Sequence, residues 1–252
     1  MFQILKFIPT MKTLLKYYKK RKAAVNDLLE KPARAYTPAT FHDLRVEIKK
    51  LNALTDLLNY CSEDFKRKKI FRPFKIIFRQ AGKVRELQVE QAMLRKYCNK
   101  NSLNEYWNKL KLNLHTEHVT FFTLLTEKII EQLKKSEHKL IPFIKENDKK
   151  EAADYISSKE EKIKKLLKQN TLQLHELRKC LKQLNYNRKS LDLDSNFNVH
   201  QADELSSLLG KWHDCRVVAK HLEKVIMSGR INSGEINALK KIKAKLLSES
   251  LV

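Results

Sequence analysis

A histidine, an arginine, a lysine and an asparagine recur at the same spacing in two separate stretches of the chain. The first set is His42, Arg45, Lys49 and Asn52, and the second is His175, Arg178, Lys182 and Asn185. On a helix these positions are i, i+3, i+7 and i+10, so each set lies along one face. Arginine, lysine and protonated histidine are hydrogen-bond donors without an acceptor, so such a row suits an anionic ligand.

Each polar row runs beside an apolar stripe that can pack into a core. The stripes contain Leu44, Ile48 and Leu51 in the first stretch and Leu177, Leu181 and Leu184 in the second. Because the two stretches lie about half of the 252-residue chain apart, they predict two similar halves rather than a solenoid with repeats of roughly 20–50 residues. One copy alone would be interpreted as a solvated basic face, but two copies in register favour a binding site.

A second pair of similar segments follows these two helices. The segments are Ala81-Gly82-Lys83-Val84-Arg85-Glu86 and Leu209-Gly210-Lys211-Trp212-His213-Asp214. Together with the two His-x-x-Arg-x-x-x-Lys helices, they resemble the conserved histidine α-helical domain family, CHAD, over most of the chain. The resemblance implies an all-α fold of two four-helix bundles, related by a pseudo-twofold axis through an internal duplication. It also implies a basic surface between the bundles that binds inorganic polyphosphate.

The chain departs from the family pattern at three of these positions. The family usually carries a further arginine or lysine where this chain has Asn52 and Asn185, and an arginine where it has His213. These differences remove positive charge from the expected site and leave the expected fold unchanged.

The expected polyphosphate contacts come from both histidine helices and from the adjoining segments. Arg45 and Arg178 would be forked donors, while Lys49 and Lys182 would act as mobile point charges. The full set of candidates is His42, Arg45, Lys49, Lys50, His175, Arg178, Lys182, Arg72, Lys75, Arg79, Lys83, Arg85, Lys211 and Arg216. For the residues outside the two histidine helices, a solvated basic face is the competing interpretation.

The charge of the whole chain agrees with a polyanionic partner. There are 52 Lys and Arg against 29 Asp and Glu, a formal net charge of +23. Such an excess attracts polyphosphate, and equally nucleic acid or an anionic membrane surface. A general enrichment in lysine would also explain it, so charge alone does not choose among these partners.

The composition and the breaks in the pattern predict helices throughout one domain spanning residues 1–252. We expect an N-terminal helical half at about 10–142 and a C-terminal half at about 148–250, separated by the segment from Pro142 to Glu151. Thr37 and Pro38 predict the start of the first histidine helix, as cap and first residue. Gly82 and Gly210 are expected to end or bend their helices. Scattered cysteines and the lack of a signal peptide predict a cytoplasmic protein, with polyphosphate granules as one location consistent with the resemblance.

No catalytic constellation is found, so the sequence predicts a binding protein without enzymatic activity and without a cofactor. Phosphate-binding glycine loops and a serine nucleophile elbow are both absent from the sequence. His115 and His118 have i, i+3 spacing, but no carboxylate or cysteine joins them as a metal ligand. The alternatives to polyphosphate binding are a basic helical protein that binds nucleic acid non-specifically, and an accessory scaffold whose histidines bind metal.

Overall fold

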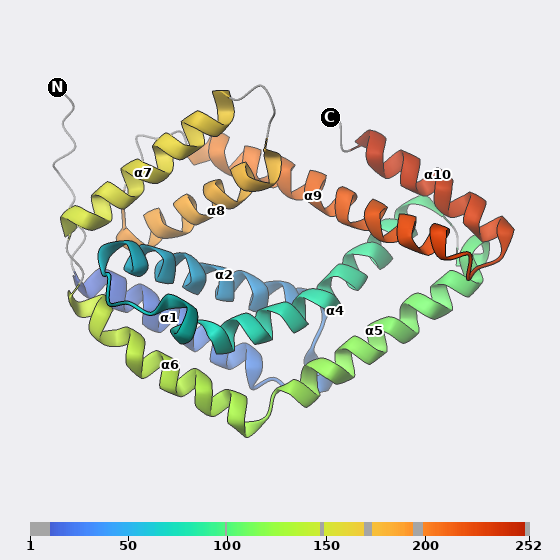
Figure 1. Cartoon of the computed structure of the whole chain (residues 1–252). Helices are drawn as coiled ribbons and strands as arrows, with labels where there is room; N and C mark the ends of the chain where they lie inside the picture. The colour runs from blue at the N-terminus through green and yellow to red at the C-terminus, as the bar shows by residue number, and fades with distance from the viewer. Residues whose placement is uncertain (1–10, 99, 147–148, 169–172, 194–198, 250–252) are drawn as a thin grey trace. The chain divides into compact units, whose positions relative to one another are not determined.

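The fold is all-α, as the sequence predicts. The computed structural model describes residues 11–98, 100–146, 149–168, 173–193 and 199–249, and these residues contain ten α-helices, two short 3-10 helices and no strand (Figure 1). The α-helices are α1 (Met11–Leu29), α2 (Pro38–Cys61), α3 (Arg67–Ile70), α4 (Arg72–Tyr97), α5 (Asn104–Leu124), α6 (Glu127–Glu146), α7 (Lys149–Lys168), α8 (Leu174–Leu191), α9 (Val199–Ser228) and α10 (Ser233–Glu249). None of the helices, within these residues, is long and apolar enough to cross a membrane.

The helices form two compact units, each built from two separate stretches of the chain. Unit 1 contains residues 1–78 and 125–206, and unit 2 contains residues 79–124 and 207–252. Helices α4 and α9 both begin in unit 1 and end in unit 2. These units differ from the two halves expected along the sequence, and the internal duplication remains a prediction.

Unit 1 is held together by the apolar stripes of the histidine helices and their neighbours. Helix α2 packs against α1, α7 and α8, and α6 packs against α1. Leu44 and Ile48 of α2 and Leu181 of α8 are buried, as expected for residues at helical spacing that face a core. On the other side of α1, Lys22 forms a 2.6 Å ion pair with the buried carboxylate of Glu137 on α6.

Unit 2 has its own core, formed where α4, α5, α9 and α10 meet. Buried side chains of this core include Leu94 of α4, Trp107 of α5, Leu222 of α9 and Leu239 of α10. The buried carboxylate of Glu235 accepts hydrogen bonds from the backbone N–H groups of Glu105 and Tyr106, at 2.8 and 2.9 Å. These are two of the otherwise unbonded donors at the first turn of α5, so Glu235 caps that helix.

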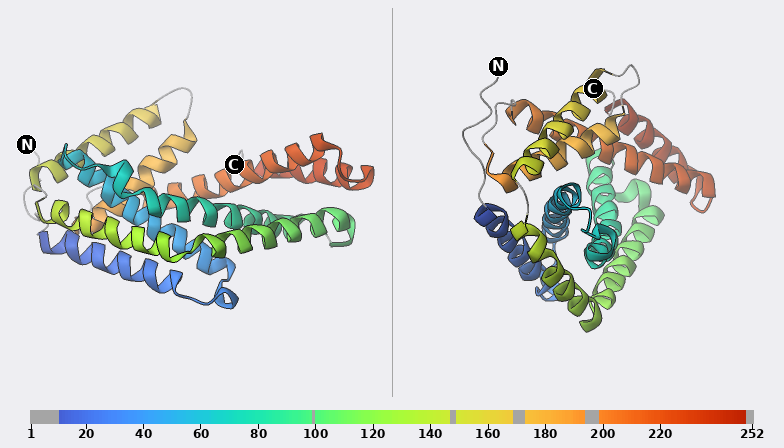
Figure 2. Two further views of the ribbon diagram at one scale, coloured as in Figure 1. Left: turned by 60° about the horizontal axis from the view of Figure 1, so that its bottom comes forward. Right: turned by 60° about the vertical axis from the view of Figure 1, so that its left-hand side comes forward.

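The local signals in the sequence had different outcomes. The predicted start of α2 is confirmed, because Thr37 and Thr40 form a reciprocal capping box and Pro38 is the first helical residue. The expected interruptions at Gly82 and Gly210 are wrong: α4 and α9 continue through them as unbroken helices (Figure 2). A glycine inside a helix lowers its stability by only about 1 kcal/mol, which packing along the rest of a long helix offsets. Ser195 and Asn196 also predict a helix start, and both lie outside the described residues.

Candidate functional site

The two histidine helices, far apart in the sequence, pack against each other in unit 1. Helices α2 and α8 are in direct contact, and both also contact α1 and α7 (Figure 1). The leucines and isoleucine of their apolar stripes are buried, while the side chains of their polar rows are exposed or half-buried. We call His42, Arg45 and Lys49 of α2 and His175, Arg178 and Lys182 of α8 the paired rows.

In the α2 row, the cations pack on the side chain of Phe78. Arg45 Nη1 donates a 2.8 Å hydrogen bond to the carbonyl oxygen of Phe78, and its Cζ lies 4.2 Å from the centre of the Phe78 ring. Lys49 Nζ is 5.8 Å from the same ring centre. Phe78 belongs to the first turns of α4, which lie in unit 1. A cation over an aromatic face is electrostatically favourable, so Phe78 helps to hold both positive charges in place.

In the α8 row, Arg178 has a donor without an acceptor. Its Nε atom is buried and has no hydrogen-bond partner in the structure. The phenol of Tyr186, two turns further along α8, has its pKa raised by burial, while Arg178 opposes the rise and Glu47 and Asp203 add to it. Because Glu47 is on α2, the phenol of Tyr186 lies within the electrostatic influence of both α2 and α8.

Glu47, on the opposite side of α2 from Arg45 and Lys49, is paired with two other cations. Its carboxylate accepts hydrogen bonds from Arg21 of α1, with Nη1 to Oε2 at 3.1 Å, and from Lys50, with Nζ to Oε1 at 2.6 Å. Arg21 and Glu47 side chains are 14% and 12% exposed, so the pair is only weakly screened by water. Lys50, a predicted phosphate contact, therefore has its ammonium group in an ion pair with Glu47.

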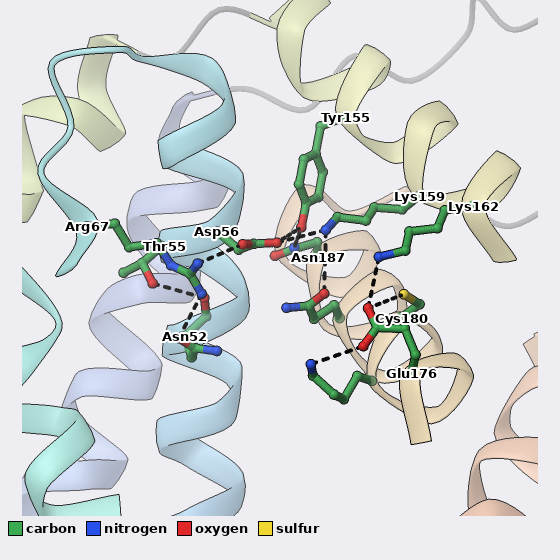
Figure 3. A network of polar contacts seen from close by, with 12 residues as sticks. Asn52, Thr55, Asp56, Arg67, Tyr155, Lys159, Lys162, Glu176, Cys180 and Asn187 are labelled. Atoms are coloured by element: carbon green, nitrogen blue, oxygen red, sulfur yellow. Dashed lines mark hydrogen bonds and ion pairs between the residues drawn. The ribbon is translucent and has the colours of Figure 1, made fainter. Parts of the chain in front are cut away.

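A second polar network, centred on Asp56, fixes α2 relative to α3, α7 and α8 (Figure 3). Asp56 forms ion pairs with Arg67 at 3.0 Å and Lys159 at 2.9 Å, and accepts a 2.8 Å hydrogen bond from the hydroxyl of Tyr155. Asn187 of α8 donates to that same hydroxyl at 3.0 Å. Burial acts to raise the pKa of Asp56, but these donors and positive charges outweigh it and lower the pKa below its usual value.

The two asparagines that replace the family's basic residues have structural partners. Asn52 Oδ1 accepts a 3.1 Å hydrogen bond from Arg67, which links α2 to α3. Asn185 Nδ2 donates to the carboxylate of Asp203 at the start of α9. An arginine or lysine could not accept from Arg67, so Asn52 suits the local network as well as changing the charge of the face.

The remaining predicted contacts are divided between the two units. Arg72 and Lys75 lie exposed at the start of α4 in unit 1. Arg79, Lys83, Lys211 and Arg216 are exposed and Arg85 is half-buried, and all five belong to unit 2. Their participation with the paired rows in one binding surface remains a prediction.

Sequence reasoning missed three residues that take part in the polar contacts of α2. The role of Glu47 could have been suspected, because it precedes Lys50 by three positions on one helix face. No sequence spacing points to Arg21 or Phe78, because they contact residues of α2 from other helices.

The alternative that the histidines bind a metal finds no support in a cluster of ligands among the described residues. Among the residues that the structure describes, no group of three His, Cys, Asp or Glu side chains could hold a metal ion. His118 instead packs edge-on against Phe122, with ring centroids 5.7 Å apart, and burial together with His115 lowers its pKa.

Comparisons with known proteins agree with the helical architecture. Residues 18–223 match the family described as CHAD domain. The crystal structure of the CHAD domain from the plant Ricinus communis superimposes with a TM-score of 0.72 at 14% identity, covering 98% of this chain and 89% of that one. PptA from Streptomyces chartreusis gives a TM-score of 0.71 at 12% identity, covering 96% and 95%. At such identities the two structures establish similarity of fold. No curated protein sequence matches the chain.

Proposed function

Because the chain belongs to the CHAD domain family, which is associated with polyphosphate binding, we propose that it binds inorganic polyphosphate without catalysing a reaction. The observation that carries this proposal is the packing of α2 against α8, which places the paired rows in the same compact unit. A polyphosphate chain presents regularly spaced oxyanions and no bases, so a surface of arginine and lysine can bind it without reading a sequence.

The two arginines of the paired rows are suited to complementary tasks. The contacts of Arg45 with Phe78 hold its guanidinium in one position, so less side-chain entropy is lost when a phosphate binds. In Arg178 the Nε atom is buried away from solvent, so the outer Nη groups of its guanidinium are the donors that would meet a phosphate. Lys49 and Lys182 would follow the chain as flexible charges on either helix.

A matched pair of double variants tests this function. Arg45→Gln with Arg178→Gln removes two charges from the paired rows, whereas Lys134→Gln with Lys139→Gln removes two charges from exposed positions on α6 of the same unit. We expect the arginine variant to weaken the binding of long-chain polyphosphate by about tenfold or more, since each charge-assisted hydrogen bond contributes roughly 1.5–3 kcal/mol. The lysine control should change it only slightly.

The same titrations distinguish a specific polyphosphate site from general electrostatic attraction by the net positive charge. They are made by calorimetry at several salt concentrations, with double-stranded DNA as the competing polyanion and circular dichroism as the check of folding. Polyphosphate binding that persists at salt concentrations where DNA has dissociated supports the proposal. Equal losses in the two double variants, or equal affinity for DNA at matched salt, would contradict it and favour a general attraction from the net charge of +23.

A further inference from the structure

Unit 2 contains a cavity of about 500 Å³ between α4, α5 and α9, and all of its lining residues belong to that unit. Its polar lining comes from lysines and glutamates of three helices and from one histidine. Lys83 and Glu90 are on α4, Glu117 is on α5, and Lys220, His221 and Lys224 are on α9. Positions 220, 221 and 224 fall within an arc of about 100° on α9, because position 224 lies between the other two around the helix.

His221 is held in place by a carboxylate that is almost completely buried. The side chain of Glu90 is 2% exposed, and its two oxygens contact the hydroxyl of Tyr106 and Nδ1 of His221. The His221 side chain is 38% exposed and lines the cavity. Since Nδ1 is used by Glu90, the second ring nitrogen is the atom available to a ligand. The hydrogen bond that His221 donates to Glu90 raises the pKa of His221, so its protonated form, in which both nitrogens donate, is favoured.

The charges around the cavity leave lysines without a carboxylate partner. The carboxylate of Glu117 is already bonded to the amide of Gln80 at 2.6 Å and to Lys83 at 3.6 Å, and Glu90 is bonded to His221. Lys220 and Lys224 form no hydrogen bond or ion pair within the part of the chain described, and Glu86 is the one further carboxylate in the lining. The accessible groups on α9 are therefore cationic donors converging on one space.

We propose that this cavity is a separate binding site for a compact phosphate oxyanion, held by Lys220, Lys224 and the outer ring nitrogen of His221. Free orthophosphate, inorganic tripolyphosphate and the terminal phosphoryl group of a longer molecule share this chemistry. Glu90 is a positioning residue that orients the imidazole from the buried side. The site does not depend on the polyphosphate function assigned to the paired rows, because it lies wholly within unit 2.

Calorimetric titration of the full chain with inorganic tripolyphosphate tests the site. Lys220→Gln with Lys224→Gln removes the two lysines, and Lys240→Gln with Lys241→Gln removes the same charge from exposed positions on α10 of the same unit. We expect the first variant to lose about tenfold or more in affinity for the more tightly bound equivalent of tripolyphosphate. The affinity of the second variant should stay within about twofold of the wild type. A parallel titration with orthophosphate shows whether a single phosphoryl group is enough for binding.

The imidazole of His221 reports binding directly. The groups that face it are Lys83, Glu86 and Glu90 of α4, Tyr106 and Glu117 of α5, and Lys220 and Lys224 of α9. Sulfate is used as the probe because its charge stays constant across the titration range of histidine. Its binding should raise the pKa of His221, because a nearby negative charge favours the protonated imidazole. The pKa is measured by NMR of the ring protons, which the His221→Gln variant assigns. The rise should be absent in the Lys220→Gln, Lys224→Gln variant.

Two outcomes would overturn this site. One is a loss of affinity no greater than in the α10 control, and the other is a His221 pKa that sulfate leaves unchanged. If tripolyphosphate binding disappears in the Arg45→Gln, Arg178→Gln variant and survives in the Lys220→Gln, Lys224→Gln variant, the cavity proposal fails while polyphosphate binding by the paired rows stands. The reverse result would establish the cavity as the tripolyphosphate site, and the paired rows would be judged by the titration with long-chain polyphosphate alone.

Discussion

Arg45 of α2 contacts Phe78 of α4 in two ways, through a 2.8 Å hydrogen bond to its carbonyl oxygen and through its ring, 4.2 Å from the guanidinium carbon. One phenylalanine therefore fixes the position of the arginine at the centre of the α2 row. A guanidinium that is already oriented loses less freedom when it binds a phosphate, so this contact connects the packing of unit 1 with its proposed affinity.

The interaction of Arg45 with the Phe78 ring can be measured by a double-mutant cycle. Phe78→Leu removes the ring and keeps the backbone carbonyl, and Arg45→Gln removes the cation. We expect a coupling of about 0.5–2 kcal/mol in the free energy of unfolding, from urea denaturation of the four proteins. Strictly additive effects of the two changes would show that the ring contributes nothing to holding Arg45.

Glu47 should stabilise the fold while opposing polyanion binding. Glu47→Gln leaves Arg21 and Lys50 without their carboxylate, so we expect the free energy of unfolding to fall by about 1–3 kcal/mol. The same change removes a negative charge from unit 1 without touching the paired rows, so polyphosphate should bind at least as tightly as to the wild type. Glu63→Gln, at an exposed position after α2, is the control with the same change of charge. A large loss of polyphosphate affinity on changing Glu47 would mean that it positions the paired rows.

The lowered pKa of Asp56 predicts a loss of stability in acid. A carboxyl whose pKa is lower in the folded chain stabilises the fold above its unfolded pKa of about 3.9, and this stabilisation disappears as pH falls through the folded value. Asp56→Asn should therefore reduce stability at neutral pH and flatten its dependence on pH below about 5. Urea denaturation at a series of pH values measures both effects.

Asp64→Asn is the matched control for Asp56, because Asp64 is exposed and follows the same helix. It should leave the acid dependence as in the wild type. Some dependence should persist in every variant, because hydrogen bonds from Lys162 and Lys179 lower the pKa of Glu176 to about 2. A pH profile of Asp56→Asn that superimposes on the wild type would contradict the role assigned to the Asp56 network.

Two glycines, Gly210 inside α9 and Gly229 directly after it, should respond in opposite directions to alanine. A Cβ at Gly210 meets no atom within 4 Å and the position is inside a continuous helix, so Gly210→Ala should stabilise the fold by about 0.5–1 kcal/mol. Gly229 follows the helix with φ of +62°, so Gly229→Ala should destabilise it by about 1 kcal/mol. Thermal denaturation of both variants tests these signs. Destabilisation by Gly210→Ala would indicate that α9 is not continuous there.

The sequence by itself determined the features that depend on neighbours along the chain. Helical periodicity in His42, Arg45 and Lys49, and again in His175, Arg178 and Lys182, was enough to identify two amphipathic helices and an all-α family. The start of α2 was also predictable, because a threonine cap followed by proline acts within a single turn.

Only the tertiary structure decided which charges are compensated and which helices are interrupted. Three contacts show this, and each joins residues far apart in the chain. Glu47 of α2 pairs with Arg21 of α1, and Arg45 of α2 packs on Phe78 of α4. Glu90 of α4 orients His221 of α9. Spacing within one helix contains no information about such partners. Gly210 was misjudged for the same reason: its local propensity disfavours a helix, but packing along the 30 residues of α9 outweighs that cost.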